Sequence, residues 1–484
     1  MATTTGPPEQ AKPQVKVHIH IPKPDHGFDL ADPSSIDLQV AFDQISLRCD
    51  VTIKPNEQGT SITVIATHNN KAVEAISAIR QVLVSKPVDD SLWCPSVLVN
   101  PPKNGKDSLQ VVLVKKAGLP GMRPAAAQLE TGQPAASTQV AAENAKFKQD
   151  FEEALRQIGD NLRYVPNKMR MRVHFGTFLL QEWKKGKAEY TLGEFESIAH
   201  RAGPRGTARM DYIVGNEGVA GRLRKSLVDS GCLPVTVRSD GPDDVEPMHS
   251  LILVTKNLKI ESPIERVQGK GKTQAKGKGQ YHYILSPFKA FRREQRHRAL
   301  EILVSCPENH HDWMLEIQNQ VSRDDAQTSL PFNETHLMKN TTFIGEATAI
   351  GLPDITISPL FLRTFEIEGI LAKTTWSYMF SSQYTVDISV HRKWGTTMAE
   401  QPLIGAAIDM FDTQWDYDMD PADISTGPRS WKVDFGKQFL TADPDFCFEN
   451  EPRNSDLDPY DAFLFWIRRA QKMLDEATED GKKV

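Results

Sequence analysis

The chain has 484 residues, of which 39% are hydrophobic and 25% are charged, and its formal net charge is −6 at pH 7. This length allows two or three domains with sizeable cores, and the composition is that of an ordinary soluble globular protein. No apolar run approaches the roughly eighteen residues that a transmembrane helix needs, so we expect no membrane partner.

The charge is unevenly distributed along the chain. Arg163–Val228 holds thirteen Lys and Arg residues against six Asp and Glu, and Glu261–Leu300 holds ten against three. Gln401–Val484, in contrast, holds eighteen acidic residues and nine basic ones. A basic middle favours a polyanionic partner, which the acidic overall charge conceals.

The five cysteines are scattered and form no Cys-x-x-Cys pair, which is typical of reduced thiols. Residues 1–14 lack the apolar core of a secretory signal, and we expect them to be a disordered tail. We therefore predict a cytoplasmic location, with the nucleus as the alternative.

Residues 15–115 are predicted to form a small αβ unit. Hydrophobic periodicity predicts a strand over 15–21, a helix over 36–48, strands within 49–55 and 61–67, and a helix over 70–84. This order, with the segments VAFDQISLRCDVTIKP and SITVIATHNNKAVEAISAIRQVL, resembles a KH domain, a module that usually binds single-stranded nucleic acid.

The resemblance fails at one functional position. A KH domain holds the nucleic-acid backbone with a GXXG loop, and the matching place here reads Asp32-Pro33-Ser34-Ser35. Proline lacks an N–H group and the aspartate repels phosphate. Either the unit is a degenerate KH-like fold used for packing or protein contact, or nucleic acid is held elsewhere.

Residues 116–142 are rich in Ala, Pro, Gly and Gln, which predicts a flexible linker. Residues 143–249 follow as a basic, helix-rich region. Within it, RVHFGTFLL (Arg172–Leu180) predicts a strand, and Thr191 with Glu194 forms the capping box of a helix that should end near Gly203.

Residues 250–484 are predicted to be a β-rich domain with an acidic C-terminal part and a terminal helix. Asp354–Trp394 is rich in Thr, Ile and aromatic residues, which indicates antiparallel strands. The predicted fold class is α+β, with an N-terminal KH-like αβ unit followed by a larger α+β domain of mainly antiparallel sheet. The terminal helix should dock on the sheet through Tyr460, Phe463, Leu464, Ile467 and Leu474.

No catalytic or metal-binding signature stands out, and we predict neither an enzyme nor a cofactor. Gly271–Thr273 lacks the preceding glycine of a phosphate-binding loop. Cys306–Asp312 contains possible zinc ligands, but its adjacent histidines favour a turn. The acidic run Asp412–Asp423 does not match an EF-hand loop, although a hydrolase using Asp416–Asp420 is a third hypothesis.

The KH-like unit, the linker and the segment RVHFGTFLLQEWKKGKAEYTLGEFE together resemble a group of filamentous-fungal proteins with a large uncharacterised domain. That resemblance implies an RNA-associated, non-enzymatic role. We predict a single-stranded RNA-binding protein, and the alternative is a protein–protein adaptor. The predicted phosphate-binding residues are Lys184, Lys185, Lys187, Arg201, Arg205, Arg209, Arg222, Arg224, Lys225, Lys270, Lys272, Lys276, Lys278, Arg292, Arg293 and Arg296.

Overall fold

The structure is a computed structural model of the chain, which divides into two compact units. The smaller unit comprises residues 1–93, 156–166 and 421–434, and the larger unit comprises residues 94–155, 167–420 and 435–484. The residues described are 15–20, 36–55, 61–85, 96–101, 110–115, 121–126, 137–162, 168–181, 187, 189–203, 205–236, 245–256, 258–268, 281–292, 299–320, 332–344, 354–381, 383–415, 435–440 and 458–479.

The smaller unit is a three-stranded antiparallel sheet with two helices. Its elements are β1 (Val15–His20), α1 (Ile36–Cys49), β2 (Val51–Pro55), β3 (Ser61–Ala66) and α2 (Asn69–Ser85). Strand β3 lies between β1 and β2, and alternate β3 side chains are buried against the helices. The predicted order of elements is observed, whereas the Asp32–Ser35 segment lies outside the described residues.

The larger unit is built on one extended sheet. Its strands are β4 (Ser96–Val99), β5 (Gln110–Lys115), β6 (Met122–Ala126), β7 (Lys168–Leu180), β8 (Glu189–Thr191), β9 (Ala208–Asp211), β10 (Leu233–Pro234), β11 (Met248–Val254), β12 (Leu258–Gln268), β13 (Tyr281–Leu285), β14 (Lys289–Arg292), β15 (Ala299–Ser305), β16 (Asp312–Gln320), β19 (Gly369–Met379), β20 (Tyr384–Trp394) and β21 (Leu403–Asp412). The main path runs β13-β12-β11-β19-β20-β21-β7-β16-β15-β4, and the described neighbours are antiparallel except for β15 and β4. The predicted α+β class with mainly antiparallel sheet is therefore confirmed.

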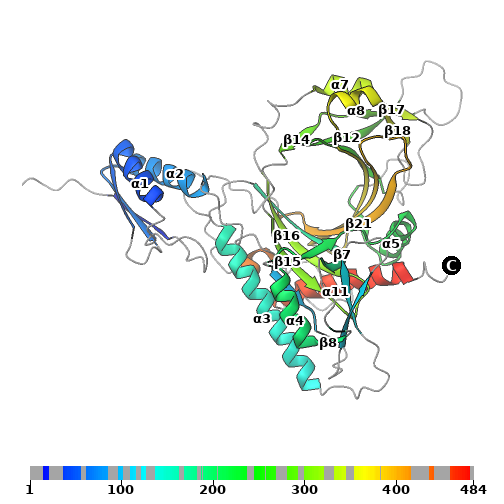
Figure 1. The fold of residues 1–484 in the computed structure, drawn as a ribbon, viewed down its shortest axis with the longest axis horizontal. Helices are drawn as coiled ribbons and strands as arrows, with labels where there is room; N and C mark the ends of the chain where they lie inside the picture. Colours follow the sequence, from blue (N-terminus) through cyan, green and yellow to red (C-terminus); the bar gives the residue numbers. More distant parts are fainter. Residues whose placement is uncertain are drawn as a thin grey trace, which may run out of the picture. The chain divides into compact units, whose positions relative to one another are not determined.

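Helices cover this sheet, and a separate hairpin joins β17 (Thr341–Ile344) to β18 (Asp354–Ile357). The helices are α3 (Ser137–Leu162), α4 (Leu192–Ala202), α5 (Glu217–Asp229), α7 (Glu334–Asn340), α8 (Pro359–Thr364), α10 (Phe435–Leu440) and α11 (Pro459–Glu479). The sheet curves strongly, and α5, α7, α8 and α11 lie outside the curve (Figure 1). None of the helices in the described ranges is long and apolar enough to cross a membrane.

The two faces of the curved sheet differ in chemistry. On the face that these helices cover, here called the outer face, Phe463 of α11 packs against Tyr384 and Trp313. The opposite face, here called the inner face, carries the alternate residues of the same strands, and many of these are charged or hydroxylic. At the β15 and β16 end, α4 covers the inner face through an apolar cluster that includes Phe195 and Met314.

The predicted terminal helix and helix start are both observed. The expected docking residues of α11 are all buried. Thr191 caps α4 through its side chain, and the Glu194 carboxylate accepts from the Thr191 N–H (3.0 Å), which completes the capping box. Tyr190 and Phe195 are buried in one cluster, as a hydrophobic staple requires.

Several stretches join the sheet across the boundaries expected from composition. The stretch predicted as a linker contains β6 and the first residues of α3. Strands β4 and β5, expected in the first unit, pair with β15 and with β6 in the larger one, and β7 pairs with β16 and β21. Local composition cannot predict these pairings, because β4, β5 and β7 each pair with a strand that is distant in sequence.

Candidate functional site

The inner face gathers ionisable side chains from five adjacent strands. Across the sheet, the register places Glu316 of β16 opposite Arg172 of β7, Asp409 of β21 opposite His174, and Asp387 of β20 opposite Asp409. Residues opposite each other on antiparallel strands share a face and lie about 5 Å apart. The strand pairing therefore assembles a charged cluster from segments that are far apart in the chain.

His174 is held between two carboxylates. Its Nδ1 lies 2.6 Å from Asp409 Oδ1, and its Nε2 lies 2.8 Å from Glu316 Oε2. Burial alone would lower the pKa of His174, but the two carboxylates overcome it and raise the pKa to about 9. A protonated His174 therefore donates to both carboxylates at neutral pH and ties β7 to β16 and β21.

The two carboxylates respond in the opposite direction. Burial opposes ionisation of both, but the protonated His174 prevails and lowers the pKa of Asp409 and of Glu316. Glu301 of β15 lies opposite Glu316 and is half-buried. Burial, followed by the charge of Glu316, raises the pKa of Glu301 to about 7, so this carboxyl titrates near neutrality.

The segment after β9 covers part of this cluster. The Tyr212 ring meets the His174 imidazole edge-on, with the ring centroids 5.0 Å apart. Ile213, the residue after Tyr212, packs against Gly405 of β21. A Cβ at Gly405 would come within 2.8 Å of Ile213 Cδ1, so this position has room only for glycine. Burial, followed by the charge of Glu316, raises the pKa of Tyr212 and keeps its hydroxyl protonated.

Further along the inner face, the groups are less completely paired. Ser377 Oγ donates to Asp387 Oδ1 (2.5 Å), and the hydroxyls of Thr375 and Ser389 bond each other (3.0 Å). Beyond them, Lys373 and His391 lie opposite each other on β19 and β20. His391 Nε2 is buried and makes no hydrogen bond within the described part of the chain.

The predicted phosphate-binding residues fall into three groups. Arg201, Arg205 and Arg209 are exposed around the turn that joins α4 to β9. Within the described residues, Arg201 Nε donates to the Ser197 carbonyl, and Arg205 and Arg209 make no ion pair or hydrogen bond through their side chains.

Three of the four residues of the second group make protein contacts instead. Arg222 Nε donates to the Ala477 carbonyl (2.6 Å), and the Arg224 guanidinium lies 4.3 Å from the centroid of Trp376. Lys187 forms an ion pair with Glu194 (2.5 Å), whereas Lys225 is exposed on α5.

The third group falls beyond what can be described. The side chains outside the described residues are Lys184, Lys185, Lys270, Lys272, Lys276, Lys278, Arg292, Arg293 and Arg296. The Asp416–Asp420 run is outside them too. Of the sixteen predicted side chains, Arg201 at the end of α4, Arg205 in the following turn and Arg209 in β9 are therefore the three exposed around one connection.

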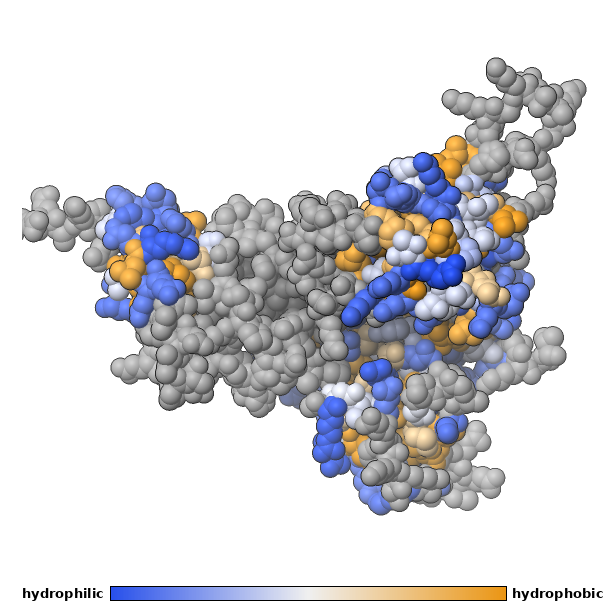
Figure 2. All heavy atoms as spheres, turned by 45° about the horizontal axis from the view of Figure 1, so that its top comes forward, coloured by the Kyte–Doolittle hydropathy of each residue, from blue (hydrophilic) through white to orange (hydrophobic). Residues whose placement is uncertain are grey.

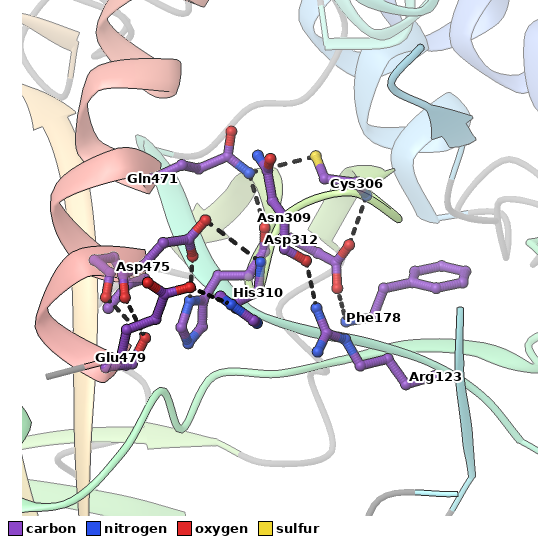
Figure 3. A network of polar contacts seen from close by, with 12 residues as sticks. Arg123, Phe178, Cys306, Asn309, His310, Asp312, Gln471, Asp475 and Glu479 are labelled. Atoms are coloured by element: carbon purple, nitrogen blue, oxygen red, sulfur yellow. Dashed lines mark hydrogen bonds and ion pairs between the residues drawn. The ribbon is translucent and has the colours of Figure 1, made fainter. Parts of the chain in front are cut away.

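The Cys306–Asp312 segment forms the predicted turn, and its side chains bind protein groups (Figure 3). Asp312 accepts from the N–H groups of Cys306 (2.6 Å) and Phe178 (2.8 Å). His310 and His311 lie 2.7 Å and 2.8 Å from carboxylates of α11. Across the described ranges, no group of three or more His, Cys, Asp or Glu residues is arranged to hold a metal ion.

Comparison with known proteins places this chain in no family. No family model matches it, and no curated protein does. Among solved structures, it has a distant likeness to the S. pombe Pct1 RNA triphosphatase, with a TM-score of 0.26 and 8% identity over 56% of this chain and 80% of that one. The same protein in complex with the Spt5 CTD gives a TM-score of 0.29 and 7% identity over 68% and 92%. Likeness at this level carries no argument about fold or activity.

Sequence reasoning missed the inner-face cluster. His174 is separated by 142 residues from Glu316 and by 235 residues from Asp409, so no local motif contains them. One signal was available in β7, where Arg170, Arg172 and His174 alternate with apolar residues. In a strand, that alternation places all three polar side chains on one face.

Proposed function

We propose that this protein is a non-enzymatic, single-stranded RNA-binding protein that contacts phosphates through the turn between α4 and β9. The observation that supports it most is the exposure of Arg201, Arg205 and Arg209 around one tight turn. We call these three residues the arginine turn.

Two backbone hydrogen bonds close this turn among its described residues. The Gly206 N–H donates to the Gly203 carbonyl (2.8 Å), and the Thr207 N–H donates to the Ala202 carbonyl (3.0 Å). Gly206 has a φ of 65°, which a residue without a Cβ adopts readily. A compact turn holds the two flanking chain segments close together, so the guanidinium groups can approach neighbouring phosphates of one strand.

The charge of the turn is largely uncompensated. Arg205 and Arg209 have no ion-pairing partner among the described side chains, and Arg201 uses one N–H group for the Ser197 carbonyl. Arginine presents several N–H donors that suit phosphate oxygens, and single strands let those oxygens reach a surface turn without a fitted groove. Base identity would contribute little to such contacts.

The test is the salt dependence of binding to a mixed-sequence single-stranded RNA. The triple variant Arg201→Gln, Arg205→Gln, Arg209→Gln should bind more weakly, with a salt slope shallower by about 1 to 2 units if two or three phosphate contacts are lost. A matched control, Lys256→Gln, Lys339→Gln, Lys472→Gln, removes three exposed positive charges elsewhere on the larger unit.

Two results would contradict the proposal. An equal loss in the control variant would mean that net charge, not the turn, governs binding. No binding by the folded wild-type protein at low salt would favour the adaptor alternative. For that alternative, Figure 2 shows hydrophobic residues interspersed among hydrophilic ones on the visible described part of the larger unit.

A further inference from the structure

Three polar side chains form a row across the inner face, near the end opposite His174. His391 on β20 lies opposite Lys373 on β19, and Lys373 lies opposite Ser250 on β11. Neighbouring strands are about 4.8 Å apart, so the row spans about 10 Å. All three residues are half-buried.

None of the three side chains has a hydrogen-bond partner within the described part of the chain. His391 Nε2 is buried and unbonded. The nearby carboxylate of Asp387 responds to the Lys373 charge, yet it accepts from Ser377 Oγ and forms no ion pair with the lysine. Buried polar atoms in folded proteins are nearly always satisfied, so the lack of a partner at His391 Nε2 among the described residues indicates a missing one beside Lys373 and Ser250.

The electrostatics of the row indicate the charge of that partner. Burial, followed by the positive charges of Lys373 and Lys259, lowers the pKa of His391 to about 4, although Asp409 acts in the opposite direction. The imidazole is therefore neutral at pH 7 beside two cations. A negative group at this position would be attracted by the lysines and could accept from the Nε2–H tautomer of His391 and from the Ser250 hydroxyl.

We propose that the His391–Lys373–Ser250 row binds an oxyanion, a phosphate or carboxylate group carried by a ligand. One ammonium, one imidazole N–H and one hydroxyl supply donors to several oxygens of a single group. Gly405 lies opposite His391, and the Ile213 side chain packs against Gly405 at this edge of the row. The site is separate from the arginine turn and does not depend on RNA binding.

The experiment is calorimetric titration of the full chain with inorganic phosphate and, separately, with acetate, at constant ionic strength maintained with chloride. We expect binding of one of these ions, and Lys373→Gln should weaken it at least about tenfold, because a charge-assisted hydrogen bond is lost. Lys256→Gln is the matched control, since Lys256 is an exposed lysine outside the row. Phosphate binding alone would assign a phosphoryl ligand, and acetate binding alone a carboxylate ligand.

A second measurement follows His391 directly. In protein carrying labelled histidine, with the resonance assigned by His391→Gln, the bound anion should raise the pKa of His391 from about 4. If Lys373 serves only to support the fold and no anion binds, adding the anion should leave the pKa of His391 unchanged. Absence of binding by both ions, or binding that Lys373→Gln leaves unchanged, would overturn the proposal. Retained phosphate binding in the arginine-turn variant would separate this site from the proposed function.

Discussion

Two histidines on the inner face of the same sheet have opposite chemistry. His174 lies between Asp409 and Glu316 and is held protonated, with a pKa raised to about 9. His391 lies beside Lys373, its Nε2 has no partner among the described groups, and its pKa is lowered to about 4. Both are partly buried, so the sign of the neighbouring charges decides the difference. At one end of the face the histidine is paired with carboxylates, and at the other its Nε2 has no partner among the described groups.

The largest difference between the two histidines is expected when the paired one, His174, is removed. His174→Leu would leave two buried carboxylates, those of Asp409 and Glu316, without their shared cation. We expect a loss of about 3–5 kcal/mol in the free energy of unfolding, measured by urea denaturation. Adding Glu316→Gln to His174→Leu should recover part of that loss, because one uncompensated charge disappears. A midpoint that His174→Leu leaves unchanged would mean that the cluster does not stabilise the fold.

The pH dependence of stability should report the same pairing. The pKa of His174 is about 9 in the folded chain and about 6.5 when exposed, so its contribution is complete below pH 6.5 and is lost as pH rises through 9. The loss should approach about 3 kcal/mol across that window. Denaturation midpoints of the wild type and of His174→Leu, measured from pH 6 to 10, should therefore converge as pH rises, and parallel curves would contradict the assignment.

Ionisation of Glu301 should destabilise the fold, which is the opposite of the effect of the protonated His174. Its pKa rises from 4.5 to about 7, so ionisation costs stability as pH increases through this range. Glu301→Gln should therefore stabilise the protein by up to about 3 kcal/mol at pH 8 and change little at pH 4. A destabilised variant at pH 8 would show that the ionised carboxylate makes a favourable contact.

The capping box of α4 provides a reference effect away from the inner face. Thr191→Ala removes the acceptor for the Glu194 N–H, which lies 3.3 Å from the Thr191 hydroxyl. We expect a loss of about 1 kcal/mol in the free energy of unfolding. Thr191→Ser keeps the acceptor and should remain close to the wild type in the same urea titration.

The smallest effect is expected at the unpaired histidine. His391→Leu repeats the substitution of the first prediction on β20, which β21 separates from β7, but it removes an imidazole whose Nε2 has no described partner instead of a shared cation. The free energy of unfolding should change by less than about 1 kcal/mol, because no buried partner is left unsatisfied. A loss as large as that of His174→Leu would remove the contrast between the two positions.

Local patterns predicted much of the fold. The Thr191 cap, the apolar face of α11 and the strand over Arg172–Leu180 were predicted correctly because each depends on residues a few positions apart. The unit boundaries differed where β4 and β5 join a sheet whose other strands come much later. The His174 cluster was not predicted, because its members meet only after β7 has paired with β16 and β21.

For the basic residues, too, the sequence does not predict which side chains make long-range contacts. Charge counts treated Arg205 and Arg222 alike, yet Arg205 is exposed on a turn and Arg222 donates to the C-terminal helix. Composition gives the number of cations in a region, whereas the surrounding backbone carbonyls and aromatic rings decide which of them are used internally.

Strand β7 has a consequence for how the chain folds. It pairs with β16 on one side and β21 on the other, and its contact with β21 joins residues 235 positions apart. On the ribosome, β7 would emerge long before either partner and would expose unpaired backbone N–H and C=O groups along its edges and an apolar face. Contacts of such long range also slow folding. The completion of this sheet therefore awaits synthesis of β21, and chaperone binding to nascent chains that end before β21 would be its measurable trace.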